Sequence, residues 1–540
     1  MTTTTLELLR EGRRVEIWRK YCGFIDLSLD EFMGIQRRLL MEQIDLLSKC
    51  ELGRHLLGDE VPTTVEEFRE SLPLTTYEDY APYLLVKREE ALPVRPHWWL
   101  HTSGRSGEYP YKWIPYTDGM VKRLGECSMA GFIFGSCSRR DQFVFDEKDN
   151  MLFALAPFPY ISGAALQAVA SEFNFTYLPP MQEAVKMEFR ERISAGFKLA
   201  LKEGMGGFNG VASVLARIGA QFVEGGGGTI KPSLELLHPK VAVRILKALI
   251  RSRLDGRKHL LPKDLWDVKC IGVGGTDTSL FKDQITEYWG RMPIENYACT
   301  EAGFLASQTW NGKGMTFYPD CNFLEFIEYG QGEGEEDAVR VPKPVLLDEV
   351  EAGKRYEIVV TNFMGGAMTR YRVGDIIEIV ALKDDDVGIH LPQMLFYSRS
   401  NDLIDLGGLA RLTERTIWHA IANAGIPYTD WVARKEYEGK DIVLHLYIEP
   451  KGEGQFDLEE IRDRIEHNLR GLDHEYADLK RQWNMEPVRV SLLAPGSHAN
   501  YYETRQREGA DLAHSKPPHM NPPEQALRLL LGAGAKARVG

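Results

Sequence analysis

Hydrophobic residues near the start of the chain recur at the spacing of an amphipathic helix. Ser28 and Glu31 have the spacing of a capping box, so this helix is expected to begin near Leu29. Six apolar residues would share one face at about 3.6 residues per turn: Phe32, Ile35, Leu39, Leu40, Ile44 and Leu47. The same start signal recurs twice, at Thr64 with Glu67 and at Thr75 with Glu78. We therefore expect short N-terminal helices joined by turns.

Further along the chain the apolar residues form short runs that are typical of β-strands. The runs at residues 322–328, 356–361 and 375–380 are rich in β-branched and aromatic residues and are separated by turn residues. Helical stretches alternate with them. This mixture predicts an α/β or α+β body rather than a helical bundle, and we expect α/β.

A new pattern begins after Ser398. Residues 442–448 and 488–492 have the composition of strands, and Asp457 with Glu460 has the spacing of a helix start between them. We therefore expect a large N-terminal domain over residues 1–398, a hinge at 399–402 and a small α+β domain over 403–540.

Composition and charge limit the kinds of partner. The chain is 44% hydrophobic and 26% charged, as expected for a soluble globular protein, and its net charge of -13 disfavours nucleic acid and anionic membranes. Any anionic ligand must therefore meet a local basic site. The uncharged stretch 151–170 contains Pro157, Pro159 and Gly163, which favour a buried strand and turn over a transmembrane helix.

Cysteine and histidine usage excludes several further classes of protein. The seven cysteines form no CxxC pair and follow no secretory leader, so we expect a cytoplasmic location. The thirteen histidines show no HExxH spacing, which argues against a zinc site. The absence of a GxSxG motif argues against a serine hydrolase.

The segment HTSGRSGEYPYKWIPYT, residues 101–117, has the chemistry of a phosphate-binding loop. Its hydroxyl groups and glycines could cradle a polyphosphate, with positive charge from Arg105 and Lys112: Thr102, Ser103, Gly104, Ser106 and Gly107. The spacing does not match GxxxxGK[ST] or GxGxxG, and an isolated loop of this kind is more often a surface turn.

Three later segments offer further candidate ligands of a nucleotide. In IGVGGTDTS, Gly274 and Gly275 could bring bare backbone against a flat base, although such a sequence is also a plain strand-to-turn junction. In NYACTEAG, Tyr297 could stack on a base, Thr300 could donate to a phosphate and Glu301 could bind Mg²⁺. The alternative for this segment is a loop with a core tyrosine.

The third of these segments, TRYRVGD at residues 369–375, ends just before a predicted strand. The Asp375 carboxylate could accept two ribose hydroxyl groups. Its alternative is a plain turn with an Arg–Asp pair.

These segments occur in an order that resembles the adenylate-forming (ANL) superfamily. Within it, the chain is similar to the plant auxin-responsive acyl-acid amido synthetases called Gretchen Hagen three, through PLTTYEDYAPYL at 73–84, MTFYPDCNFLEFI at 315–327 and the long segment 341–375. Phenylacetate-CoA ligases are a weaker likeness, carried also by SRSNDLIDLGG. The resemblance implies the adenylate-forming fold, with a large N-terminal domain and a small C-terminal lid.

The resemblance also implies a role for each candidate residue. The loop at 102–107 would bind the β- and γ-phosphates of ATP, although Arg105 replaces a small hydroxyl residue that is usual in the superfamily. The other implied roles are Gly274, Gly275 and Tyr297 around adenine, Thr300 at the α-phosphate, Glu301 on Mg²⁺, and Asp375 and Arg399 at the ribose.

A catalytic lysine is implied near the C-terminus. GADLAHSKPPHM, residues 509–520, resembles the lysine segment of the family, with Lys516 as the matching residue. A carboxylate and the α-phosphate of ATP are both anionic, so a cation between them would offset their repulsion. Without the resemblance, a lysine beside prolines is most simply a surface residue.

The sequence thus predicts an enzyme, an ATP- and Mg²⁺-dependent ligase that adenylates a small carboxylic acid and transfers the acyl group to an amine, such as an amino acid. Transfer to CoA is the main alternative. A non-catalytic nucleotide- or acyl-binding protein is the alternative from another class. The identity of the acid and of the acceptor, the oligomeric state and the pathway stay open.

Overall fold

The computed structural model describes most of the chain, namely residues 4–58, 60–102, 112–187, 189–224, 238–274, 278–329, 343–399, 403–407, 409–439, 441–452, 457–483, 485–507, 519–522, 524–532 and 538–539. These residues form two compact units, the first ending at Ser398 and the second beginning at Arg399. The hinge expected at 399–402 stays a prediction.

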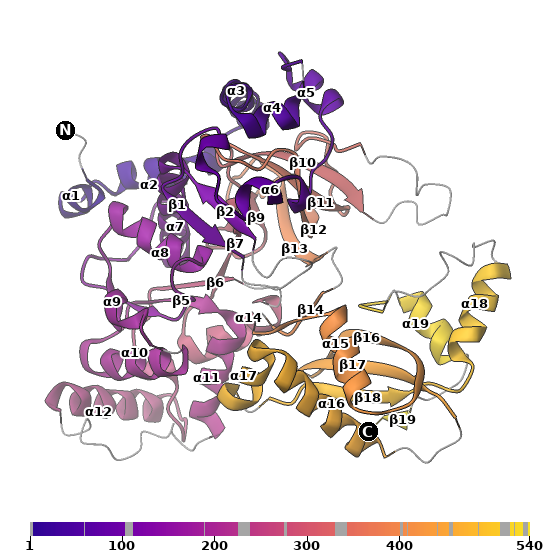
Figure 1. Cartoon of the computed structure of the whole chain (residues 1–540). Helices are drawn as coiled ribbons and strands as arrows, with labels where there is room; N and C mark the ends of the chain where they lie inside the picture. Colours follow the sequence, from indigo (N-terminus) through magenta and orange to yellow (C-terminus); the bar gives the residue numbers. More distant parts are fainter. Residues whose placement is uncertain are drawn as a thin grey trace. The chain divides into compact units, whose positions relative to one another are not determined.

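One mixed β-sheet organises the first unit (Figure 1). Its parallel part, β4-β3-β5-β6-β7, continues into an antiparallel part from β7 to β10. In sheet order, the strands among the described residues are β10 (Asn322–Tyr329), β11 (Arg355–Asn362), β12 (Tyr371–Ala381), β13 (Gln393–Arg399), β9 (Met315–Phe317), β8 (Gly303–Gln308), β7 (Ile294–Cys299), β6 (Cys270–Gly274), β5 (Gly207–Val211), β3 (Asn150–Phe153) and β4 (Thr176–Leu178).

Helices connect the parallel strands, as parallel pairing requires. The most buried of the helices, α7, packs against β6, β7 and β8. The α-helices of the first unit are α1 (Thr5–Arg10), α2 (Arg14–Cys22), α3 (Leu29–Ser48), α4 (Glu51–Leu57), α5 (Val65–Ser71), α6 (Ala81–Leu84), α7 (Asp118–Ser136), α8 (Ile161–Glu172), α9 (Met181–Ala184), α10 (Phe189–Glu203), α11 (Ala212–Glu224), α12 (Pro239–Leu254), α13 (Pro262–Leu265) and α14 (Thr278–Trp289). A separate hairpin consists of β1 (Trp98–His101) and β2 (Trp113–Tyr116).

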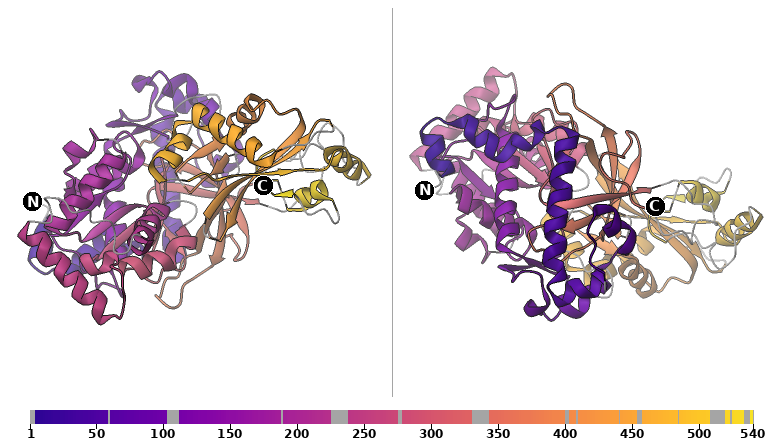
Figure 2. Two further views of the ribbon diagram at one scale, coloured as in Figure 1. Left: turned by 90° about the horizontal axis from the view of Figure 1, so that it is seen from below. Right: turned by 90° about the horizontal axis from the view of Figure 1, so that it is seen from above.

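The N-terminal helices lie together on one side of the unit and face the viewer in the right-hand view of Figure 2. Helix α3 begins at Leu29 as predicted, with both capping-box bonds present between Ser28 and Glu31. Its buried face also contains two polar residues that the hydrophobic pattern does not reveal, Gln36 and Gln43. Both donate to main-chain carbonyls of distant segments and so tie α3 to them.

One predicted helix start is wrong by a residue. The capping pair at the third site is Thr76 with Asp79, not Thr75 with Glu78. Thr75 is buried instead, because its N–H donates to the carbonyl of Arg370 over 2.9 Å and its hydroxyl to that of Thr369 over 2.7 Å. Because Thr75 is bonded to a distant segment, it cannot act as the helix cap that the local sequence predicts.

The strand predictions are confirmed. The three predicted runs form β10, β11 and β12, which are neighbours in the sheet. The uncharged stretch 151–170 supplies β3, a turn and part of α8, and no helix within the described part of the chain is long and apolar enough to cross a membrane.

The second unit is a small α+β domain, as predicted. Strands β16 (Tyr428–Glu438) and β17 (Asp441–Pro450) form a hairpin, and β18 (Val488–Leu492) runs parallel to β17. Its other elements are β14 (Leu403–Asp405), β15 (Arg411–Thr413), β19 (Arg538–Val539), α15 (Glu414–Asn423), α16 (Leu458–Leu472), α17 (His474–Trp483), α18 (Ser497–Arg507) and α19 (Glu524–Leu531).

A buried ion pair holds the chain just before the predicted ribose residue. Arg370, 4% exposed, donates twice to the Glu325 carboxylate, 1% exposed, over 2.9 and 3.0 Å. Arg370 also donates to the carbonyls of Arg69 and Leu72. The second arginine of this segment, Arg372, pairs with Glu357. Glutamates are therefore the partners that the structure records for both arginines of TRYRVGD.

We predict that Arg370→Met lowers the free energy of unfolding by about 3 to 5 kcal/mol, because it leaves a buried carboxylate without its main partner. Urea denaturation followed by tryptophan fluorescence would measure the change. Arg355→Met is the matched control, since its pair with Glu378 is 41% and 34% exposed, and it should cost no more than about 1 kcal/mol. Equal losses in the two variants would contradict the prediction.

Candidate functional site

A tight turn between β7 and β8 carries two of the predicted site residues. Thr300, Glu301 and Ala302 form this turn, and Gly303 follows with φ +70°. That value lies in the left-handed region, which glycine adopts readily. Thr300 is 6% and Ala302 4% exposed, whereas Glu301 is half-buried.

Buried side chains hold three consecutive carbonyls of this turn. The hydroxyl of Tyr116 donates to the carbonyl of Thr300 over 2.8 Å. The side-chain amide of Asn362 donates to Glu301 over 3.0 Å, and that of Asn322 donates to Ala302 over 2.8 Å. These donors come from β2, β11 and β10 respectively, so three separate strands fix the backbone that presents Thr300 and Glu301.

The two asparagines also bind each other. Asn362 Nδ2 donates to Asn322 Oδ1 over 2.8 Å, and the N–H of Met368 donates to Asn362 Oδ1 over 3.0 Å. Gln36 completes the network, since its Nε2 donates to the carbonyl of Asn322 over 2.7 Å. A network of this kind is stable only when all its buried polar groups are paired.

Tyr297 and Asp375 lie side by side although 78 residues separate them in the chain. The Tyr297 hydroxyl donates to Asp375 Oδ2 over 2.9 Å, and the two residues are 7% and 3% exposed. The ring of Phe396 lies 6.0 Å from that of Tyr297. The structure thus brings the predicted adenine residue on β7 and the predicted ribose residue on β12 into contact, while their roles stay predictions.

The ends of the predicted phosphate loop meet next to the His101–Trp113 pair, where the connecting segment leaves the β1–β2 hairpin. The N–H of Thr102 donates to the carbonyl of Lys112 over 3.1 Å, and the N–H of Lys112 donates to the Thr102 hydroxyl over 3.4 Å. Ser103, Gly104, Arg105, Ser106 and Gly107 lie outside the described residues.

Lys112 brings positive charge to the same region as Glu301. Its Nζ lies 3.5 Å from the Tyr371 hydroxyl and 5.6 Å from the centre of the Tyr77 ring. Burial raises the pKa of Tyr371, and the negative charge of Glu301 raises it further. Tyr371 therefore stays neutral between an ammonium and a carboxylate group.

Glu301 meets the requirements of a magnesium ligand. No described residue forms a hydrogen bond or an ion pair with its carboxylate, and no cluster of three metal-binding side chains occurs among the described residues. Mg²⁺ is usually held by one or two carboxylates together with substrate phosphates and water. A single accessible carboxylate on a fixed backbone fits that mode of binding.

The remaining predicted residues are at the limits of the described segments. Gly274 ends β6 and Arg399 ends β13, whereas Gly275 and Lys516 lie outside the described residues. The chain is next described at His519, whose Nε2 lies 2.8 Å from Asp430 Oδ1 and whose Nδ1 contacts Glu414.

His519 and Asn521 are bonded to a strand of the second unit. The N–H of Ala433 on β16 donates to the carbonyl of His519 over 2.6 Å, and the N–H of Asn521 donates to the carbonyl of Ala433 over 2.7 Å. The His519 ring stacks on Trp431 at 4.4 Å. Burial acts to raise the pKa of Asp430, but the bonds from His519 and from the N–H of Trp431, together with the nearby histidine charges, outweigh it and the pKa is lowered.

Sequence reasoning missed Tyr116, Asn322 and Asn362. The two asparagines lie at the outer ends of predicted strands, where a polar residue is usually taken as the start of a turn. What singles them out is that Asn322 and Asn362 are directly opposite each other in the β10–β11 register. That pairing is visible only in the structure.

Comparison with known proteins gives this site a family context. Two family models match the chain, the GH3 family N-terminal domain over residues 23–155 and the GH3 family central domain over residues 315–399. The chain carries two GH3 family domains. The N-terminal GH3 domain contains Tyr116 and the loop at 102–107, and the central domain contains Asn322, Asn362 and Asp375.

Several curated proteins are similar to parts of this chain. A GH3 domain-containing protein of Mus musculus is 25% identical over 278 residues, which cover 49% of each chain. Jasmonoyl–L-amino acid synthetase JAR4 of Nicotiana attenuata is 26% identical over 36% of this chain and 33% of its own length. Indole-3-acetic acid-amido synthetase GH3.4 of Arabidopsis thaliana is 29% identical over 29% and 27%. The chain thus spans half or less of the length of these relatives.

Two solved structures share the fold over nearly the whole chain. The AtGH3.15 acyl acid amido synthetase in complex with 2,4-DB aligns with a TM-score of 0.50 at 17% identity, covering 92% of this chain and 93% of its own. A 2-hydroxyisobutyryl-CoA ligase in complex with 2-HIB-AMP and CoA aligns with a TM-score of 0.52 at 14% identity, covering 91% and 94%. The predicted fold class, a large N-terminal and a smaller C-terminal domain of the adenylate-forming type, is confirmed.

We predict that Asn362→Leu lowers the free energy of unfolding by about 2 to 4 kcal/mol, because it leaves the Glu301 carbonyl and the Met368 N–H buried without their partners. Urea denaturation would measure this loss. The exposed Asn174→Leu is the control and should change stability by no more than about 0.5 kcal/mol. A loss no larger than that in Asn362→Leu would mean that water replaces the amide without cost.

Proposed function

We propose that the protein is an ATP-dependent ligase that adenylates a carboxylic acid and transfers the acyl group to an amine, namely an amino acid. The observation that supports this most is the braced turn of Thr300 and Glu301, beside the Tyr297–Asp375 pair, within a GH3 chain. Two of the similar proteins are named as synthetases that join an acid to an amino acid or amide nitrogen, and this supports the proposal that the acceptor is an amine.

The proposed first step joins two anions. The substrate carboxylate attacks the α-phosphorus of ATP. The bond from the α-phosphorus to the oxygen that bridges it to the β-phosphate breaks, pyrophosphate departs, and an acyl-adenylate is formed. Thr300 would donate to the α-phosphate, the loop at 102–107 and Lys112 would hold the β- and γ-phosphates, and Lys516 would offset the charge of the approaching carboxylate.

The remaining residues would hold the nucleoside. Asp375 would accept the ribose hydroxyl groups, with Arg399 near the same sugar, and charge-assisted bonds of this kind are stronger than neutral ones. Gly274, Gly275 and Tyr297 would surround adenine. Bound to Glu301, Mg²⁺ would neutralise phosphate charge and so favour attack at the α-phosphorus.

In the proposed second step, the amine nitrogen attacks the acyl carbon of the adenylate. The bond from that carbon to the phosphate oxygen breaks, AMP leaves, and the nitrogen loses a proton as the amide forms.

We also propose a cytoplasmic location, supported by seven free thiols, which are typical of a reducing compartment.

Acid-dependent exchange of labelled pyrophosphate into ATP tests the first step. The wild-type protein should exchange with at least one acid of a broad carboxylate panel when Mg²⁺ is present. Glu301→Gln should reduce exchange by at least about tenfold and raise the Mg²⁺ concentration needed, since an amide oxygen is a weaker ligand than a carboxylate.

Glu287→Gln is the matched control for that experiment, because Glu287 is exposed on α14, and it should exchange like the wild type. An unchanged Mg²⁺ dependence in Glu301→Gln would remove Glu301 from the site. No exchange with any acid would favour the non-catalytic binding protein.

A competition between acceptors tests the second step. The protein, ATP and a competent acid are incubated with equal concentrations of CoA and mixed amino acids, and the products are identified by mass spectrometry. We expect the amide to dominate. A thioester as the main product would overturn the amine assignment and leave adenylation intact.

A further inference from the structure

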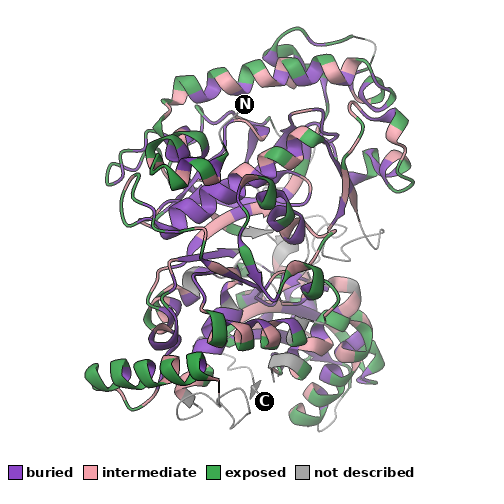
Figure 3. Ribbon diagram, turned by 90° about the vertical axis from the view of Figure 1, so that its left-hand side faces the viewer, coloured by how far each residue is buried: buried purple, intermediate pink, exposed green. Residues whose placement is uncertain are grey.

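Helix α12 exposes a row of large apolar side chains. Val243, Leu246, Ile250 and Leu254 are 52%, 59%, 52% and 81% exposed, and no described residue covers them. At about 100° per residue, these four side chains fall within roughly a quarter turn of the helix. We call them the α12 ridge. In Figure 3 most of the helix is coloured as exposed.

The α12 ridge points directly away from the body of its unit. The residues that α12 buries are Val241, Ala248 and Ser252, and they lie on the opposite side of the helix axis. The ridge is therefore convex and outermost. Contiguous apolar surface on a protein usually marks a site that binds another protein, a membrane or a ligand.

Positive charge runs along one flank of the ridge. Lys240, Arg244, Lys247 and Arg251 form this row, and Arg253 lies on the other flank. The sixteen residues of α12 contain these five basic residues and no acidic one, although the whole chain has a net charge of -13. The charge of the helix is thus opposite to that of the protein.

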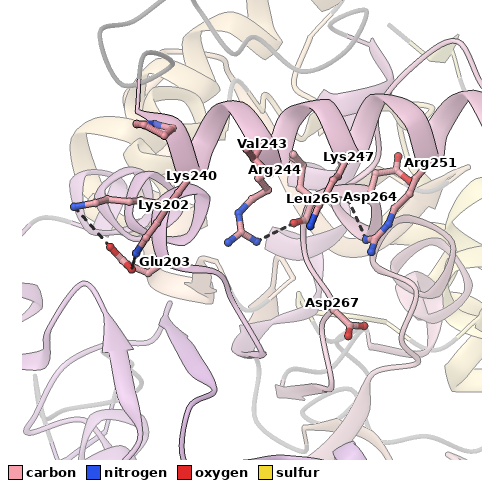
Figure 4. Close-up of a pocket in the computed structure, with 11 residues that line it drawn as sticks. Lys202, Glu203, Lys240, Val243, Arg244, Lys247, Arg251, Asp264, Leu265 and Asp267 are labelled. Atoms are coloured by element: carbon pink, nitrogen blue, oxygen red, sulfur yellow. Dashed lines mark hydrogen bonds and ion pairs between the residues drawn. The ribbon is translucent and has the colours of Figure 1, made fainter.

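The basic row also lines a groove of about 640 Å³ between α12 and the ends of α10 and α13 (Figure 4). Two of the carboxylates in this groove are paired, Glu203 with Lys240 over 3.1 Å and Asp264 with Arg257 over 2.7 Å. Lys247 makes no hydrogen bond or ion pair with any described residue. Arg244 and Arg251 donate to main-chain carbonyls, and the carboxylate of Asp267 also lines the groove. Lys247 is therefore the residue of this row that is available for an anion beside the ridge.

We propose that α12 binds the surface of an anionic membrane. The α12 ridge would enter the boundary between headgroups and acyl chains, and Lys247 with its neighbours would meet the lipid phosphates at headgroup depth. A helix with an apolar side and flanking Lys and Arg residues lies in the interface in this way. Long basic side chains can bury their stems and keep their charge in the polar layer.

Charge and shape favour this partner over a second copy of the chain. Two α12 ridges packed together would bring only cationic side chains into contact at their flanks, because the helix has no acidic residue. A convex ridge also suits a deformable lipid surface. The inference does not rest on the proposed ligase activity, since α12 is outside the candidate site.

Sedimentation with sucrose-loaded vesicles tests the proposal on the full chain. The probes are phosphatidylcholine vesicles with about one third phosphatidylserine and vesicles of phosphatidylcholine alone. The wild type should pellet with the anionic vesicles, less at high salt, and far less with the neutral ones.

Two variants separate the contributions of the ridge and of the charge. Leu246→Ser with Ile250→Ser should lower the partition coefficient at least about tenfold, since burial of one such side chain alone is worth about that factor. The control, Val86→Ser with Val144→Ser, changes apolar residues that are 68% and 50% exposed elsewhere and should bind like the wild type.

The charge variant, Lys247→Glu with Arg253→Glu, should lose at least about tenfold on anionic vesicles. Arg19→Glu with Lys122→Glu is the control, because it changes the net charge equally at exposed sites of other helices. Equal losses in both charge variants would overturn the proposal, because binding would then depend only on the net charge of the protein.

The proposal would also be overturned if the wild type did not pellet with anionic vesicles, or if the ridge variant bound them as well as the wild type does. Light scattering that shows a dimer lost in the ridge variant, without vesicle binding, would assign the ridge to a second copy.

Discussion

The buried turn at residues 300–302 sets a requirement that the rest of the site meets. A turn at the surface can bond its carbonyls to water, but this one is largely enclosed, so each carbonyl needs a donor from the protein. Tyr116, Asn362 and Asn322 supply these donors from three strands. The positions of Thr300 and Glu301 thus depend on segments that are up to about two hundred residues away in sequence.

The same requirement fixes the register of the sheet. Asn322 and Asn362 are opposite each other on β10 and β11, and they can reach the turn only if both side chains face it. A slip by one residue would turn both amides to the other face of the sheet. The buried Arg370–Glu325 pair and the bonds made by Gln36 act in the same direction, because each joins segments that local interactions leave independent.

Local signals in the sequence predict the elements better than they predict the contacts between them. The start of α3 at Leu29 follows from Ser28 and Glu31 alone, and the strands at β10, β11 and β12 follow from composition. Thr75 shows where this fails, since its bonds go to Thr369 and Arg370, just before β12, and the neighbours of Thr75 in sequence do not specify them. The Tyr297–Asp375 contact was suggested only by the family resemblance, and Tyr116 had no local signal, because its partner is a main-chain carbonyl.

Because Thr102 is bonded to Lys112, the stability of the β1–β2 hairpin depends little on the length of the segment between these two residues. Thr102 and Lys112 follow the last pair of β1 and β2 and are joined by one main-chain bond and by one bond from the Lys112 N–H to the Thr102 hydroxyl. These bonds and the strand pairing do not depend on the length of the segment between them. The entropy of closing such a segment rises only slowly with its length. Residues can therefore be gained or lost there during evolution at small cost, and a lineage can alter what this segment contacts without rebuilding the sheet beneath it.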